Sequence, residues 1–211
     1  MNKASIKDFL LHVHPRFIDE RSSRVTYTWC LGGLALWMFC IEAASGILLA
    51  LYYVPHTSQA YPSIQHITHL APYGFFIRNI HYWAGQGMII LVVLHAVRVF
   101  VSKAYAPPRQ WNWLLGFALL IMTFFIDFTG YLLVWDDRAL WAWTIASNLA
   151  TSVPVIGSFM SSIIWGPLEP GDITLARIYV WHVLFFPLAM TIVMGWHFWR
   201  IRADGGISIP L

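Results

Sequence analysis

Four long apolar stretches constrain this chain more than any other feature of its sequence. They cover about residues 29–52, 79–102, 112–135 and 176–200, and each is long enough to cross a hydrocarbon layer about 30 Å thick as a helix. Hydrophobic residues make up 58% of the chain and charged residues only 11%, against about 25% charged residues in a soluble domain. The sequence therefore predicts an all-α membrane protein built as a four-transmembrane-helix bundle.

The remaining segments require no second folded unit. Residues 1–28 contain no early apolar run and no small-residue cleavage site, so we expect an amphipathic N-terminal interfacial arm rather than a cleaved signal peptide. Residues 29–211 then form the four-helix domain. Its connections are a Pro- and polar-rich loop, the short basic loop KAYAPPRQ and a longer segment with Pro and Gly turn signals.

The basic residues gather on one side of the predicted bundle. Residues 53–77 contain no Lys or Arg, whereas the N-terminal arm, the KAYAPPRQ loop and the C-terminal end carry most of them. By the positive-inside rule, both termini lie on the cytoplasmic side of a bacterial inner membrane or an equivalent energy-transducing membrane. The basic residues form no long patch, so nucleic acid is not an expected partner.

Two of the predicted helices each carry a pair of histidines. His81 and His95 are 14 residues apart and His182 and His197 are 15 apart, so each pair stays near one helical face and its members are separated by about 21 Å. The two helices run in the same direction across the membrane. The spacing therefore predicts two stacked layers, with His81 opposite His182 near the outer side and His95 opposite His197 near the inner side.

Histidines paired in this way indicate bis-histidine haem iron. A lone intramembrane His is more often a hydrogen-bonding partner between helices, but four histidines at matched depths favour ligation. Two imidazoles on opposite sides of a plane suit six-coordinate haem, whereas zinc requires four ligands at one point and hydrolytic chemistry requires an open position. We expect two haems b and electron transfer, with no catalytic side chain.

The other two helices carry glycines at the same spacing. The pairs are Gly32 with Gly46 and Gly116 with Gly130, each 14 residues apart. A residue without a Cβ allows the backbone to approach a porphyrin closely. Ordinary small-residue packing between membrane helices is the alternative.

Several charged side chains are further candidates. Arg78, Arg98 and Arg109 lie near the ends of the second helix, where they could pair with haem propionates or act only as snorkelling topology signals. Glu42 and Asp127 lie within membrane helices, one turn before Gly46 and Gly130. We expect one or both carboxyls to set the outer haem's potential or to relay a proton; local hydrogen bonding to Ser45, Thr129 or the backbone is the alternative.

These histidine and glycine pairs, together with the strings CLGG, HAVRVF, PPRQWNW, TGYLLVWD, VPVIGS and GISIPL, resemble the cytochrome b/b6 family over nearly the whole chain. Length and helix number are similar to the short, four-helix cytochrome b6 form of a bc or b6f-type complex. The resemblance implies that the chain is the dihaem cytochrome b subunit of a quinol-oxidising complex. It also implies a subunit IV-like partner, a Rieske iron–sulfur protein, a c-type cytochrome and a homodimeric assembly.

The resemblance also assigns a role to Cys30. It stands two residues before Gly32, where cytochrome b6-like proteins attach a third haem through one thioether on the inner side, and Arg202 falls where they have an arginine near a propionate of this haem. An unmodified buried Cys is the alternative. Cys40 has no such support and is interpreted as a packing residue.

The chain departs from the family pattern at two quinone-site borders. Val134 replaces the Pro of GYxLPWD, and the C-terminal sequence reads RADGGISIPL instead of RKQGISGPL. These changes keep a second reading open, a dihaem membrane anchor that links a different oxidoreductase to the quinone pool. A haem-free channel or structural bundle is a third reading, and it predicts no haem absorbance.

Overall fold

The computed structural model describes residues 20, 24–166 and 169–207, and these residues contain helices and no strands. Four helices are long and apolar enough to span a membrane: α4 (Leu31–Ala50), α6 (Gly74–Val101), α7 (Gln110–Leu132) and the continuous helix formed by α10 (Asp172–Val180), a π-helical turn η1 (Trp181–Phe185) and α11 (Phe186–Ala203). The predicted all-α, four-span class is thus confirmed for the part of the chain described.

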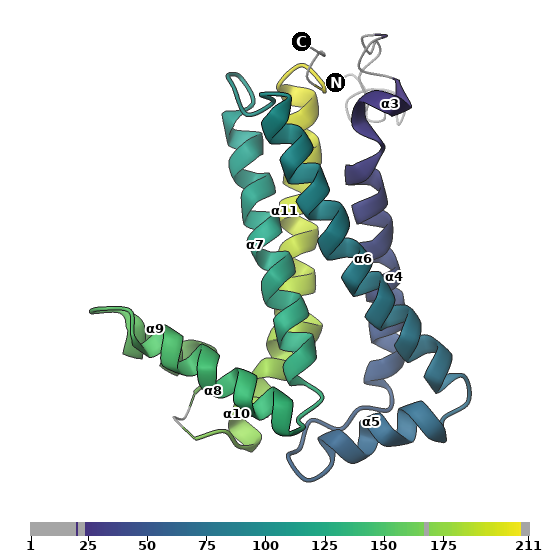
Figure 1. Ribbon diagram of the computed structural model, residues 1–211, viewed down its shortest axis with the longest axis vertical. Helices are drawn as coiled ribbons and strands as arrows, with labels where there is room; N and C mark the ends of the chain where they lie inside the picture. Colours follow the sequence, from purple (N-terminus) through teal and green to yellow (C-terminus); the bar gives the residue numbers. More distant parts are fainter. Residues whose placement is uncertain (1–19, 21–23, 167–168, 208–211) are drawn as a thin grey trace, which may run out of the picture.

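The spans pack as two pairs of helices. α4 packs most extensively against α6, and α7 packs against α11. The short α5 (Ala60–His69) connects α4 with α6 at one end of the bundle, where α8 (Asp137–Thr151), α9 (Gly157–Ile164) and α10 also project, while α3 (Val25–Thr28) lies at the opposite end (Figure 1). We call these the loop end and the terminus end of the bundle.

Large apolar side chains cover the outer faces of the spans. Leu48, Ile90, Leu114 and Ile192 are each more than two-fifths exposed. Such extensive exposure is unfavourable in water, but it matches the hydrocarbon of a bilayer, where apolar side chains face lipid and helices satisfy the backbone hydrogen bonds internally. The exposed surface therefore supports the membrane assignment independently of helix length.

The main packed core lies at the loop end, where the connecting helices meet the spans. Its fully buried members include Leu132 on α7 and Leu175 and Ile178 on α10. Tyr53, which follows α4, donates a hydrogen bond of 2.7 Å to the carbonyl of Leu133 and thereby ties α4 to the end of α7. These contacts fix the loop ends of three spans relative to each other.

Local sequence explains two features that the apolar stretches alone do not predict. The Asp136 side chain accepts a hydrogen bond of 2.8 Å from the Ala139 backbone N–H, which caps the start of α8. Pro187, in the first turn of α11, lacks the N–H that would bond to the carbonyl four residues earlier, and the preceding turn is π-helical. This π turn contains His182.

Most of the predicted N-terminal arm, residues 1–19 and 21–23, lies outside the described residues, as do residues 208–211 of the C-terminal motif. The arm and the motif remain predictions from sequence.

Candidate haem-binding site

The structure brings the four histidines together as two pairs at two depths. His81 on α6 faces His182 on η1, with ring centres 6.2 Å apart and ring planes at 77°. His95 on α6 and His197 on α11 line one cavity towards the terminus end. We call these pairs the loop-side layer and the terminus-side layer.

The separation of the loop-side rings suits a shared metal. An imidazole–metal bond is about 2 Å long and a ring centre lies about 1 Å behind its nitrogen, so two rings on opposite sides of one metal have centres about 6 Å apart. The measured 6.2 Å agrees. In the described ranges, no group of three or more His, Cys, Asp or Glu side chains could hold a metal ion.

Hydrogen bonds fix the tautomers of both loop-side rings. Nδ1 of His182 lies 2.9 Å from the carbonyl oxygen of Ile126. Since a carbonyl only accepts, Nδ1 must carry the proton. Nδ1 of His81 lies 2.9 Å from Oγ of Ser45, whose own hydrogen is directed to the Ile41 carbonyl at 2.6 Å. His81 is therefore also the donor, and Nε2 of each ring retains the lone pair that a metal needs.

The terminus-side layer lies in a cavity of about 300 Å³ between α4, α6, α7 and α11. Met88, Met190 and Met194 are among its predominantly apolar lining residues. Nδ1 of His197 is buried and has no hydrogen-bond partner in the described part of the chain. An apolar cavity with a few convergent polar groups is typical of a cofactor site.

Two arginines supply positive charge at the terminus end of this cavity. Arg98 donates from Nε to the Tyr27 carbonyl at 3.4 Å and lies over the Tyr27 ring. Its Nη2 is buried and has no hydrogen-bond partner within the part of the chain that the structure describes. Arg109 donates to the Gly206 carbonyl at 3.2 Å. Both line the cavity, so they can pair with acidic groups of a ligand there.

The four predicted glycines face the histidine rings themselves. A Cβ on Gly32 or Gly116 would lie 3.2 Å from Cε1 of His95 or His197, respectively. On Gly46 and Gly130 it would lie 3.1 Å and 2.6 Å from Cε1 of His81 and His182, respectively. The glycines thus leave room for the imidazoles, whereas the sequence suggested only close approach to a porphyrin.

Cys30, Arg78 and Arg202 occupy different places relative to the layers. Cys30 is an exposed free thiol at the N-cap of α4, has a left-handed φ of 51°, and lines the cavity that contains His95. Arg78 lies one turn before His81 on α6 and is half-buried. Arg202 lies in the last turn of α11 and is not among the residues that line the cavity. Cys40 is also a free, exposed thiol.

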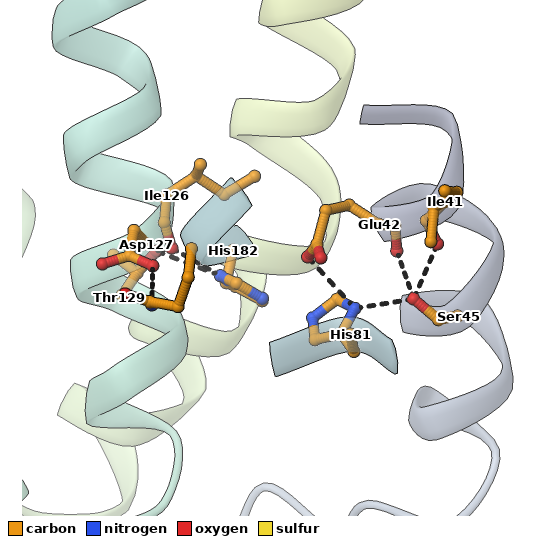
Figure 2. A network of polar contacts seen from close by, with 9 residues as sticks. Ile41, Glu42, Ser45, His81, Ile126, Asp127, Thr129 and His182 are labelled. Carbon is orange, nitrogen blue, oxygen red and sulfur yellow. Dashed lines mark hydrogen bonds and ion pairs between the residues drawn. The ribbon is translucent and has the colours of Figure 1, made fainter. Parts of the chain in front are cut away.

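Glu42 and Asp127 approach the loop-side layer from α4 and α7. Oε2 of Glu42 lies 3.2 Å from Nδ1 of His81, and Gln86 Nε2 lies 3.5 Å from Asp127 Oδ1. Figure 2 shows His81 between Glu42 and Ser45, and His182 turned towards Ile126. The sequence suggested Ser45 and Thr129 only as hydrogen-bond partners for the carboxyls. In the structure, their hydroxyl oxygens lie 2.9 Å from Nδ1 of His81 and 3.2 Å from Nδ1 of His182, respectively.

These residues fit a planar metal cofactor. Ring separation, fixed tautomers, glycines opposite each imidazole and an apolar cavity with arginines at one end all suit a tetrapyrrole with two axial histidines at each layer. The fold and site define a class of protein: an integral membrane helix bundle in which two pairs of histidines lie at two depths.

Comparison with known proteins agrees with this class. Residues 18–205 match the family model described as cytochrome b/b6/petB. The chain belongs to the cytochrome b/b6 family, which confirms the resemblance drawn from its motifs.

Individual relatives cover most of the chain. It is 35% identical over 206 residues to the menaquinol:cytochrome c reductase cytochrome b subunit of Geobacillus thermodenitrificans, covering 97% of this chain and 92% of that protein. It is 40% identical over 183 residues to cytochrome b6 of Heliobacterium mobile, covering 87% and 85%.

A solved structure shares the fold. A chain of a hyperthermophilic respiratory Complex III matches with a TM-score of 0.77 and 27% identity over 88% of this chain. This chain spans about half, 52%, of the length of that structure's chain.

Proposed function

We propose that this chain is the dihaem cytochrome b subunit of a quinol-oxidising bc or b6f-type complex and carries electrons across the membrane. The observation that carries this proposal is the arrangement of the four histidines as two pairs at two depths. The loop-side rings are 6.2 Å apart, and the Nδ1 proton of each is used in a hydrogen bond. Membership of the cytochrome b/b6 family and the printed name of a relative, menaquinol:cytochrome c reductase cytochrome b subunit, support it.

Each part of the chain has a distinct role in this proposal. His81 and His182 would hold one haem b, and His95 and His197 the other. When bound, iron porphyrin supplies reversible one-electron chemistry. The Ser45 hydroxyl and the Ile126 carbonyl keep the loop-side imidazoles in the ligating tautomer, and Arg98 and Arg109 would bind propionate groups.

The distribution of charge supports a direction for the charge movement. The KAYAPPRQ loop and the end of α11 carry Lys103, Arg109, Arg200 and Arg202, which favours a cytoplasmic terminus end. The loop-side layer would then lie near the outer surface, where quinol is oxidised, and the terminus-side layer near the inner surface, where a quinone is reduced.

A third haem is part of the proposal. Cys30 presents an exposed thiol at the cavity that contains His95, so addition of its S–H across a porphyrin vinyl group would form a thioether without an oxidant. The resemblance to the cytochrome b/b6 family further implies Rieske iron–sulfur, c-type cytochrome and subunit IV-like partners in a homodimeric complex. The printed name of one relative, menaquinol:cytochrome c reductase cytochrome b subunit, supports the cytochrome c partner.

Quinol-driven haem reduction in the native complex tests this function. We expect a menaquinol or ubiquinol analogue to reduce b-type haem in isolated membranes, and a Rieske protein to co-purify with the chain. Haem reduction without a Rieske protein would support the dihaem membrane anchor, for which Val134 in the TGYLLVWD string is the motivating residue. Absence of any b-type absorbance would contradict both functions.

A further inference from the structure

We propose that Glu42 is a positioning residue for His81, and that by accepting a hydrogen bond from Nδ1 it lowers the midpoint potential of the loop-side haem. This inference rests on the proposed function, since it requires haem at the loop-side layer. It concerns one layer only and therefore predicts that the two haems respond differently to one substitution.

The neighbouring Ser45 shows that His81 carries its proton on Nδ1, and Glu42 accepts a hydrogen bond from this N–H group. Oγ of Ser45 lies 2.6 Å from the carbonyl of Ile41 and 3.3 Å from that of Glu42. Both carbonyls only accept, so the serine hydrogen is used there and Oγ accepts from His81. With the proton on Nδ1, the Glu42 carboxyl oxygen at 3.2 Å is a second acceptor for the same N–H, as Figure 2 shows.

Glu42 is held beside His81 by its packing between the spans. Its Oε1 is buried and has no hydrogen-bond partner among the residues described. A Cβ on Gly85 of α6 would lie 3.7 Å from this oxygen and 3.8 Å from Asp127 Oδ1, so both carboxyls pack over one glycine between the spans. A carboxyl within hydrocarbon is costly unless it has a role or a partner, and the partner here is His81.

Among the residues that the structure describes, no carboxyl lies within ion-pair distance of the other three proposed ligands, His95, His182 and His197. Nδ1 of His182 bonds to a backbone carbonyl. At the terminus-side layer, the residues immediately before the facing glycines are Leu31 and Leu115, where the loop-side layer has Ser45 and Thr129. The terminus-side rings therefore have no equivalent hydroxyls, and His81 has the strongest acceptor of the four.

An acceptor on Nδ1 makes the imidazole a stronger donor to iron through Nε2. Hydrogen bonds to the outer nitrogen of a metal-bound histidine raise its basicity, and this is a recognised means of tuning a metal site. A stronger donor stabilises ferric over ferrous iron, which lowers the potential. Weakening the acceptor should therefore raise the potential of this haem.

The test is a redox titration of the purified native complex carrying Glu42→Gln or Glu42→Leu. Gln has the same shape and a weaker acceptor, while Leu has none. We expect one of the two b-type components to move to higher potential in Glu42→Gln and further in Glu42→Leu, with a changed low-spin EPR signal from that haem. The other component should not move.

Asp127→Asn is the matched control, because Asp127 lies in the same cluster but makes no hydrogen bond to His81. It should shift the potential less than Glu42→Leu. An equal shift in Asp127→Asn, equal shifts of both haems, or no shift in Glu42→Gln and Glu42→Leu with haem content intact would overturn the inference. Haem content separates the two proposals, because a wild-type chain without haem contradicts the proposed function itself. If Glu42→Leu fails to assemble, the isosteric Glu42→Gln decides.

Discussion

The glycines opposite the imidazoles leave almost no room for a side chain. Gly130 is the tightest, since an added Cβ would lie 2.6 Å from Cε1 of His182. Overpacking of this kind costs about 1–3 kcal/mol. We expect Gly130→Ala to displace the His182 ring and to reduce the haem content of the purified chain, together with its thermal stability.

Gly195→Ala is the control for this substitution. A Cβ there meets nothing within 4 Å, and Ala favours a helix over Gly by about 0.5–1 kcal/mol. This variant should retain its haem and its stability. Full haem content in Gly130→Ala would show that the glycine is not needed to accommodate the ring.

The two cysteines offer a second comparison between single residues. Both thiols are exposed, but only Cys30 lines the terminus-side cavity. We expect acid–acetone extraction of the wild-type chain to leave one covalently attached haem, and Cys30→Ala to abolish this residual haem. Cys40→Ala should retain it. Retention of the residual haem in Cys30→Ala would exclude a Cys30 thioether.

At the scale of elements, the π turn positions a proposed ligand. The turn Trp181–Phe185 contains His182 and is followed by Pro187. We expect Pro187→Ala to supply the missing N–H and to favour regular α-helix. Loss of the π turn would shift the helix register by one residue and rotate His182 by about 100° about the helix axis. One of the two haems should then be lost, or its absorption spectrum should change.

Leu188→Ala, at an exposed position of the same helix, is the control for Pro187→Ala. It should leave both haems unchanged. If Pro187→Ala retains two haems with wild-type spectra, the π turn is not what orients His182.

Apolar composition and length predict the spans well, because a bilayer imposes both. The four apolar stretches predicted the spans, although α6 begins at Gly74 rather than near residue 79 and the last span begins at Asp172 rather than near 176. The connecting helices α5, α8 and α9 were not predicted individually. They pack through tertiary contacts at the loop end, and such contacts leave a weak local signal.

At the scale of the whole molecule, the pairing of histidines followed from depth alone. The 14- and 15-residue spacings predicted which rings face each other, and the structure brings His81 to His182 and His95 and His197 to one cavity. The network around Nδ1 of His81 could not be predicted in the same way. It depends on the side-chain rotamers of Ser45 and Glu42, which sequence spacing does not specify.

The two layers also differ in their surroundings. The loop-side layer has hydroxyl, carbonyl and carboxyl acceptors, whereas the terminus-side layer lies in a largely apolar cavity with Arg98 and Arg109 at its end. Two haem sites that share the same two-histidine ligand set can therefore have different midpoint potentials. Such a difference is expected if electrons move across the membrane in one direction.

The most direct test of two bis-histidine layers is the number of extractable haems per chain, measured by a pyridine haemochrome assay after acid–acetone extraction. We expect two extractable haems b for the wild type and one each for His81→Leu and His95→Leu, with a different haem lost in each variant. Full haem content in either variant, or no extractable haem in the wild type, would contradict this expectation.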